Sequence, residues 1–148
     1  GHMTVNPFET ESCRCGKKGC LEQYCSATGI VRLAKKNIRE GMKSSLNKDN
    51  LDSKEIFRAA EENDESALNA VETASKYLGA ALSSIDAVLD TEAFIIGGGV
   101  SNAGGFLLKN IEPFFFDTSF SCKREKKILL SELKECGGMF GAASLFRE

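Results

Sequence analysis

A short segment rich in cysteine and glycine, residues 13–20, constrains this chain more than any other feature. Its sequence, CRCGKKGC, places Cys13, Cys15 and Cys20 close together. A disulfide between Cys13 and Cys15 would be strained at that separation, whereas Zn²⁺ accepts thiolate and imidazole ligands in a tetrahedral arrangement. The glycines between the cysteines allow the chain to turn sharply around an ion. The segment therefore predicts a zinc-binding loop.

A tetrahedral zinc site needs a fourth ligand, and the single histidine of the chain, His2, is the candidate. His2 lies in a Gly-His-Met tripeptide of the kind that tag removal leaves behind, so it is either native or a tag residue. The alternative interpretation of the whole segment is three unpaired cysteines beside a leftover histidine. The remaining cysteines are expected to be small buried side chains rather than ligands; they are Cys25, Cys122 and Cys136.

Composition argues against several classes of protein. The chain has 148 residues, which suits one domain with one hydrophobic core. A net charge of -2 gives no basic surface for nucleic acid. Its longest apolar runs, such as residues 94–96, are too short to span a bilayer, and no signal peptide is recognisable. We therefore expect a cytoplasmic domain without nucleic-acid or membrane partners, in a reducing compartment that favours metal binding over disulfides.

Strand-like and helix-like segments alternate along the chain. Strands are predicted at residues 3–7, 93–96 and 127–131, and the last two are apolar enough to be covered on both faces. Helices are predicted at residues 21–38, through residue 60 after a cap at Asp52 or Ser53, at 65–89, to residue 116 after a cap at Ser101 or Asn102, and after 138 through 145. Residues 11–19 are predicted to form a loop and residues 41–52 a flexible connection. The alternation predicts an α/β fold.

Three consecutive glycines, Gly97, Gly98 and Gly99, separate a predicted strand from a predicted helix. Glycine lets a ligand approach the backbone closely, and a helix N-terminus presents free N–H groups to anions. The carboxyl end of a strand in an α/β sheet is a common nucleotide position. The glycines match neither a Walker loop nor a dinucleotide fingerprint, so a tight turn without a ligand is the alternative.

Residues 13–22, CRCGKKGCLE, resemble the zinc signature of the ROK family, which contains bacterial sugar kinases, open reading frames and repressors. The similarity extends along essentially the whole chain, through GHMTVNP at residues 1–7, QYCSATG at 23–29 (closest to the glucokinase branch), FIIGGGVS at 94–101 and GMFGAA at 138–143. The resemblance implies that residues 1–148 are the C-terminal lobe of an actin-like, hexokinase-type (ribonuclease H-like) ATPase fold with an inserted zinc loop. The N-terminal lobe would then be absent.

The same resemblance assigns roles to particular residues. His2, Cys13, Cys15 and Cys20 would bind a structural zinc, and His2 together with Glu22 would contact sugar hydroxyls. A carboxylate suits this role because charge-assisted hydrogen bonds are stronger than neutral ones. The alternative is that Glu22 is merely an acidic residue in the first turn of its helix, favoured by the helix dipole. The glycines at residues 97–99 would lie against the adenosine of ATP.

The function that the resemblance implies is an ATP-dependent hexose kinase, which transfers the γ-phosphate of ATP, with Mg²⁺, to the 6-hydroxyl of glucose. The catalytic base would lie in the absent N-terminal lobe, so the chain alone is predicted to be inactive. Asp86, Asp90 and Asp117 stand at predicted helix ends and are interpreted as caps or solvated charges.

Two alternatives to a glucose kinase follow from the same resemblance. One is a fragment of a sugar-sensing transcriptional repressor, since both branches of the family carry the zinc loop. The other is a kinase for fructose, mannose or an N-acetylated hexosamine. Whichever sugar the kinase phosphorylates, the full-length protein is expected to be a homo-oligomer.

Overall fold

A computed structural model of the chain describes residues 1–120, 126–133 and 136–146. Within these ranges the α-helices and strands are α1 (Glu22–Cys25), α2 (Ala27–Arg39), α3 (Ser53–Glu61), α4 (Glu65–Leu89), β1 (Ala93–Ile96), α5 (Gly104–Thr118), β2 (Lys127–Leu130) and α6 (Gly137–Ser144). Two short 3-10 helices, η1 (Lys48–Asn50) and η2 (Gly99–Ala103), interrupt the connections. None of the described helices is both long and apolar enough to cross a membrane.

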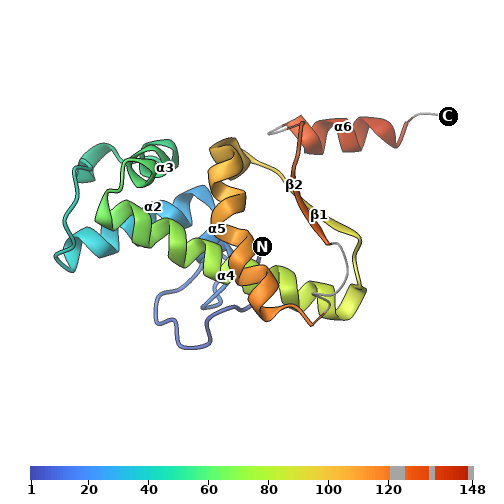
Figure 1. Ribbon diagram of the computed structural model, residues 1–148, viewed down its shortest axis with the longest axis horizontal. Coiled ribbons are helices and arrows are strands. Elements are labelled where there is room, and N and C mark those ends of the chain that lie inside the picture. The colour runs from blue at the N-terminus through green and yellow to red at the C-terminus, as the bar shows by residue number, and fades with distance from the viewer. Residues whose placement is uncertain (121–125, 134–135, 147–148) are drawn as a thin grey trace.

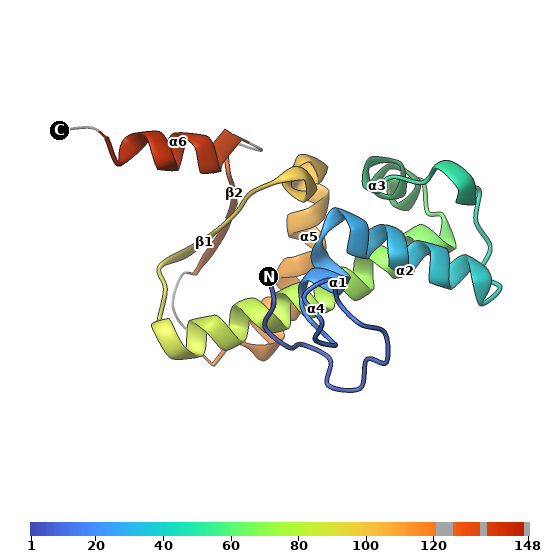
Figure 2. The same ribbon diagram turned by 180° about the vertical axis from the view of Figure 1, so that it is seen from behind.

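The longest helix, α4, forms the centre of a helical layer and contacts α2, α3 and α5 (Figures 1 and 2). Its approach to α5 is close at Gly79, where an added Cβ would lie 2.7 Å from Phe114 Cβ. The largest fully buried apolar side chains come from several helices; they are Ile30, Ile56, Val71, Ile111 and Phe115. Burial of this apolar surface is the main force that holds the helices together.

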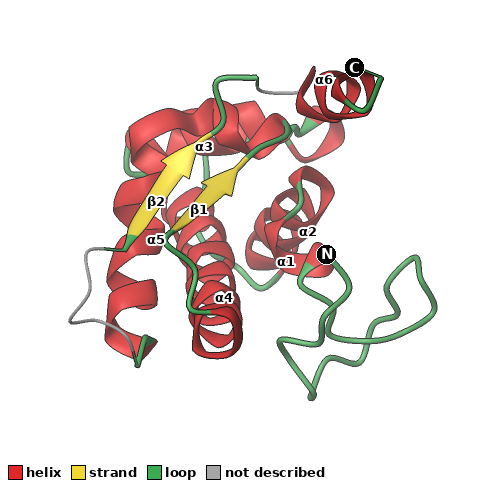
Figure 3. Ribbon diagram, turned by 90° about the vertical axis from the view of Figure 1, so that its right-hand side faces the viewer, coloured by secondary structure: helices red, strands yellow, loops and turns green. Residues whose placement is uncertain are grey.

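Strands β1 and β2 form a two-stranded parallel sheet, with Ala93 opposite Lys127 and Ile96 opposite Leu130. One face packs against the helices, as the Phe94 ring lies 5.8 Å from the Phe115 ring. Figure 3 shows both strands in front of α4 and α5.

The other face of this sheet is exposed: 71% of Ile95 and 45% of Leu129 are accessible. The prediction of strands covered on both faces is therefore wrong for the described chain, because the helices cover one side of the strands. The apolar sequence reflects a face that nothing in the described chain covers.

The single helix predicted at residues 21–38 is also wrong, because the chain breaks at Ser26. Ser26 adopts an extended conformation with ψ of 163°, and its hydroxyl accepts a hydrogen bond from the Gly29 amide at 3.0 Å. Serine is a favoured N-cap because its oxygen satisfies an otherwise unpaired amide. The break leaves α1 as one turn that can be oriented separately from α2.

Two further predicted boundaries differ from the structure. Residues 3–7 form no strand, and Thr4 makes only an isolated antiparallel bridge with Cys20. The helix predicted from residue 101 or 102 begins instead as η2, and α5 starts at Gly104, where φ is +63°. A left-handed glycine marks this change of helix type.

The connection predicted to be flexible, residues 41–52, is anchored to the start of α4. Asp64 caps α4 by accepting from the Ala67 amide at 3.0 Å. The same carboxylate accepts from the Ser44 hydroxyl at 3.0 Å and from the Ser45 amide at 2.6 Å. Asp52 caps α3, as predicted, through the Glu55 amide at 2.8 Å.

The prediction that the helix-end aspartates are caps or solvated charges is wrong for Asp86. Asp86 is 1% exposed and forms an ion pair of 2.9 Å with Lys126, which also pairs with Asp90 at 2.9 Å. Asp90 is the left-handed C-cap of α4 and Asp117 is exposed, in agreement with the prediction. The network joins the end of α4 to the start of β2.

Helix α6 follows β2 and lies apart from the helical layer (Figure 1). It ends at Ser144, close to the predicted end at residue 145, and none of its described residues is buried. Met139 is 69% exposed and Phe140 is 58% exposed. This helix therefore contributes nothing to the core described above.

Candidate functional site

Backbone hydrogen bonds fold the cysteine segment into a tight hairpin. Ser12 and Lys18 form an antiparallel bridge, and the Cys13 amide donates to the Lys17 carbonyl at 2.7 Å. At the turn, Gly16 has φ of +84° and its amide donates to the Cys13 carbonyl at 2.9 Å. This local geometry brings Cys15 back toward Cys13, as the glycine spacing predicted.

A second set of backbone contacts brings the N-terminal segment alongside Cys20. The Val5 amide donates to the Gly19 carbonyl at 2.8 Å, and the Leu21 amide donates to the Met3 carbonyl at 2.9 Å. The bridge between Thr4 and Cys20 lies between these bonds. His2 consequently stands beside the hairpin that carries the cysteines.

The resulting cluster contains His2, Cys13, Cys15 and Cys20, whose potential ligand atoms all lie within 4.8 Å of one another. Cys13 Sγ lies 3.6 Å from His2 Nδ1, and Cys15 Sγ lies 3.6 Å from Cys20 Sγ. Zinc–sulfur bonds of about 2.3 Å correspond to tetrahedral sulfur–sulfur edges of about 3.8 Å. The three thiols and one imidazole therefore fit a tetrahedral zinc ion in both chemistry and spacing.

Burial within the cluster is uneven. Cys13 and Cys20 are buried, whereas Cys15 and His2 are exposed. The Lys17 amide lowers the pKa of Cys15, while burial raises the pKa of Cys20 to about 11. A cation at this position would favour the thiolate forms, because a coordinated thiol is deprotonated.

The other cysteines lie outside the cluster. Cys25 is half-buried and donates a hydrogen bond to the Ala74 carbonyl at 3.2 Å, and its burial raises its pKa to about 12. Cys136 is exposed, so the prediction that it is a buried side chain is wrong. Cys122 falls outside the described residues.

Glu22 stands at the start of α1, next to the N-terminal residues. Its amide donates to the Gly1 carbonyl at 2.8 Å, which places its carboxylate near the segment that carries His2. Glu22 lines a pocket of about 230 Å³ together with Ser12, Cys13, Arg14, Gln23, Thr28, Gly29 and Arg32. Several of the lining side chains carry hydrogen-bonding groups, which suits a polyhydroxylated ligand. Glu22 also occupies the first helical turn, as its alternative interpretation requires.

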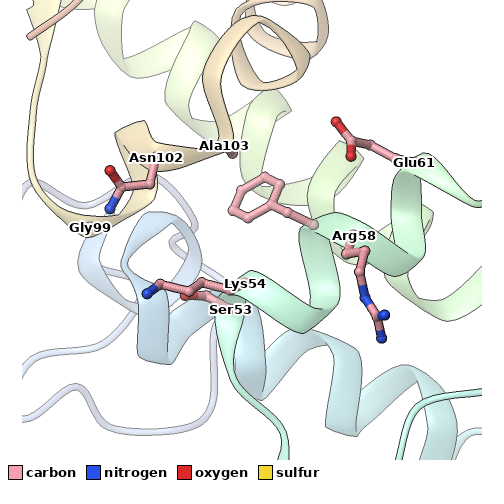
Figure 4. A pocket seen from close by; sticks show the side chains of 8 residues that line it. Ser53, Lys54, Arg58, Glu61, Gly99, Asn102 and Ala103 are labelled. Carbon is pink, nitrogen blue, oxygen red and sulfur yellow. The ribbon is translucent and has the colours of Figure 1, made fainter.

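The glycine turn borders a second pocket, of about 310 Å³ (Figure 4). Gly97 and Gly98 follow β1, Gly98 has φ of +79°, and Gly99 lines the pocket. On the opposite wall, Ser53 and Lys54 stand in the first turn of α3. The structure thus places the predicted turn at a cavity, where an anionic ligand would meet a lysine and a helix N-terminus.

Sequence reasoning missed the polar residues around this second pocket. Lys54 and Asn102 lie on opposite walls, and Arg58 and Glu61 stand further along α3 (Figure 4). Ser53 was recognised only as a possible helix cap. No sequence signal linked α3 to the glycine turn, because their proximity arises from the packing of α3 on η2.

Gly19 has φ of +70°, and an added Cβ there would lie 1.8 Å from the Asn6 carbonyl oxygen. Gly19→Ala is expected to separate the N-terminal segment from Cys20 and to weaken zinc binding by at least about 100-fold, since the strain and the clash act together. Gly16→Ala is the matched control, because its φ is +84° but its Cβ would meet nothing within 4 Å. Chelator competition measures both affinities, and equal losses would contradict the prediction.

Comparison with known proteins identifies the family of the chain. The model of the ROK family matches residues 1–148, and the chain belongs to the ROK family. It is 43% identical over 120 residues to a glucokinase of Halalkalibacterium halodurans, covering 78% of this chain and 36% of that protein. It is 26% identical over 150 residues to the xylose repressor of Caldicellulosiruptor bescii, covering 98% of this chain and 37% of the repressor.

The fold is also that of solved ROK proteins. The structure of a ROK family glucokinase from Streptomyces griseus, in complex with glucose and AMPPNP, matches with a TM-score of 0.85 and 30% identity. The match covers 98% of this chain and 49% of the glucokinase. The chain therefore has the α/β fold of ROK sugar kinases and spans about half or less of the length of these relatives.

Proposed function

We propose that this chain is the C-terminal lobe of a ROK-family hexose kinase that transfers the γ-phosphate of ATP to the 6-hydroxyl of glucose. The observation that carries the proposal is the match, over 98% of the chain, to a glucokinase bound to glucose and AMPPNP. The exposed apolar face at Ile95 and Leu129 supports a role as part of a larger fold, since such faces are normally covered. The full-length protein is proposed to be a homo-oligomer that uses Mg²⁺ with ATP.

Both candidate sites have a role in this proposal, and of the two proposed sugar contacts Glu22 is the one that lines the pocket of about 230 Å³. His2 and Glu22 contact sugar hydroxyls, and Glu22 does so through charge-assisted hydrogen bonds. The turn at Gly97, Gly98 and Gly99 forms one wall of the nucleotide cleft. Lys54, across the pocket from Asn102, is suited to attract the negative charge of the nucleotide.

Zinc has a structural role in the proposed enzyme. His2, Cys13, Cys15 and Cys20 hold the ion, which fixes the N-terminal segment against Cys20 and so positions His2 beside α1. The carboxylate of Glu22 is placed by the same contacts, through the hydrogen bond that the Glu22 backbone amide donates to the Gly1 carbonyl. A bound zinc would thus order the sugar pocket without taking part in phosphoryl transfer.

The proposal is tested by glucose phosphorylation in the longer parent protein and in the 148-residue chain. The parent is expected to be active and the chain inactive, because the catalytic base is assigned to the N-terminal lobe. In the parent, Glu22→Gln is expected to raise the KM for glucose by about 10-fold to 100-fold, since a charged hydrogen bond contributes about 1.5 to 3 kcal/mol. Glu40→Gln, an exposed surface variant, is the control.

Two results would contradict the proposal. ATP-dependent phosphorylation of glucose by the isolated chain would show that this lobe carries a complete catalytic site. An unchanged KM in Glu22→Gln would remove Glu22 from the sugar site. A parent that prefers fructose, mannose or an N-acetylated hexosamine would keep the kinase and change its substrate.

A sugar-sensing repressor is the second candidate, supported by the similarity to the xylose repressor over 98% of this chain. This candidate predicts a parent protein that binds a sugar and DNA but does not phosphorylate glucose or another hexose. The same activity measurement distinguishes the two candidates.

A further inference from the structure

Arg32 connects α2 to the loop that leads into the metal cluster. Its guanidinium donates to the Glu11 carboxylate at 2.8 Å and to the Glu9 carboxylate at 3.0 Å, and Nε donates to the Gln23 carbonyl at 3.3 Å. The guanidinium carbon also lies 5.2 Å from the centre of the Tyr24 ring. A planar, rigid guanidinium can satisfy several acceptors at fixed angles, so this side chain defines a geometry as well as a charge.

Gln23 extends these contacts to the metal ligands. Gln23 is 8% exposed, and its side-chain amide donates to the Glu11 carbonyl at 3.0 Å, two residues before Cys13. Its side-chain oxygen accepts from the Cys20 amide at 3.1 Å. One buried side chain therefore holds the backbone on both sides of the hairpin that carries the thiols.

Glu9 is the second anchor of the same loop. The Tyr24 hydroxyl donates to its carboxylate at 2.6 Å. Burial acts to raise the pKa of Glu9, but the hydrogen bonds from Tyr24, from the Glu11 amide and from Arg32 outweigh it and lower the pKa to about 2. The carboxylate is thus ionised at neutral pH and permanently attracted to Arg32. Phe8, its neighbour in the loop, is 88% exposed, so apolar burial does little to hold this segment.

We propose that Arg32 and Gln23 are positioning residues for the zinc centre, which hold the backbone around Cys13 and Cys20 in ligand geometry before the metal binds. This inference rests on the zinc centre of the proposed function. Groups behind metal ligands set ligand orientation, and their loss commonly lowers metal affinity by about 10-fold to 100-fold. Without Arg32, the loop would have to be ordered during binding, which costs affinity.

Arg32→Met tests the inference while keeping the length and apolar stem of the side chain. Its zinc affinity, measured by competition with a chromophoric chelator, is expected to fall by about 10-fold to 100-fold. Its Co²⁺ complex is expected to show weaker and shifted visible absorption bands, which report on tetrahedral ligand geometry. Arg32→Lys is expected to restore part of the affinity, because an ammonium reaches one of the two carboxylates at a time. Arg39→Met, an exposed arginine of the same helix, is the control.

Unchanged zinc affinity and Co²⁺ spectrum in a folded Arg32→Met variant would overturn the inference, as would a wild-type chain that binds no zinc. If Arg32→Met does not fold, Glu11→Gln tests the same contact from the loop side, where the carboxylate is 56% exposed. It is expected to weaken zinc binding several-fold, and an unchanged affinity would count against the proposal. Glucose phosphorylation by the parent is measured separately, so failure of the kinase assignment would leave these metal measurements interpretable.

Discussion

Replacing Cys20 with serine is expected to reduce the zinc content of the purified chain from about one ion per molecule to almost none. Cys20 is completely buried, and its sulfur lies 3.6 Å from that of Cys15. A serine hydroxyl is a poor replacement for a thiolate, and the remaining three ligands would leave an open coordination position. Elemental analysis after purification without a metal-affinity column measures this directly.

Loss of zinc is expected to loosen the N-terminal segment that carries His2, while the contacts of Arg32 and Gln23 keep the cysteine hairpin ordered and the helical layer persists. Structural zinc contributes an apparent binding free energy of about 10 to 16 kcal/mol in small zinc domains, and here that energy would be concentrated in a segment with little apolar core. The fully buried apolar side chains of the core belong to α2–α5 instead. Hydrogen exchange of the zinc-free chain should therefore show its largest loss of protection at the Val5 amide, which pairs with Gly19, and retained protection in α4.

Cys25→Ser is the matched control, because Cys25 is half-buried and lies outside the cluster. It is expected to keep its zinc. A folded Cys20→Ser chain with the zinc content of the wild type would contradict the assignment of Cys20 as a ligand. Replacing His2 by alanine then tests the fourth ligand, and it measures the contribution of His2 whether that residue is native or derived from a tag.

The metal cluster could be predicted from sequence because its ligands are close along the chain. The glycines between Cys13 and Cys20 allow the sharp turns that bring the three thiols together, so the spacing of these residues was enough to predict the cluster. The position of His2 beside the hairpin depends on backbone hydrogen bonds that residues 3 and 5 make with residues 21 and 19. The sequence proposed His2 as the fourth ligand only because it is the single histidine of the chain and because of the family resemblance. Helix α4 and strand β1 were also predicted at their observed bounds, since both have a strong and uninterrupted apolar pattern.

Features formed by distant residues escaped sequence reasoning. Arg32 meets Glu9 and Glu11 across more than 20 residues, and a charged side chain on a helix usually indicates only a solvated face. The outer face of Ile95 is apolar in sequence, but sequence does not reveal whether the covering element belongs to the same chain. The break between α1 and α2 has one sequence signal, the capping residue Ser26. Apolar residues at helical spacing on both sides of Ser26 favoured a single helix instead.

The buried ion pair of Asp86 and Lys126 also joins residues that are distant in sequence, so it could not be predicted from the sequence. Lys126→Met is expected to lower the melting temperature by about 10 °C, because it removes the cation beside the Asp86 carboxylate while that carboxylate stays buried. The Lys126 side chain is 4% exposed and also donates to the Thr91 carbonyl, just before β1. The pair therefore fixes the strand that ends at the glycine turn of the proposed nucleotide cleft. Thermal unfolding followed by circular dichroism measures the change.

Two controls and the pH dependence distinguish this ion pair from a general loss of surface charge. Lys127→Met removes the neighbouring exposed lysine and is expected to change the melting temperature little. Adding Asp86→Asn to Lys126→Met should recover part of the loss, because a neutral side chain requires no cation. The hydrogen bond to Asp86, with a smaller contribution from the one to Asp90, raises the pKa of Lys126 above its ordinary value of 10.5. The stabilisation is thus complete below about pH 10.5 and is lost as the pH rises through the higher folded pKa. A difference between wild type and Lys126→Met that disappeared at neutral pH would contradict this account.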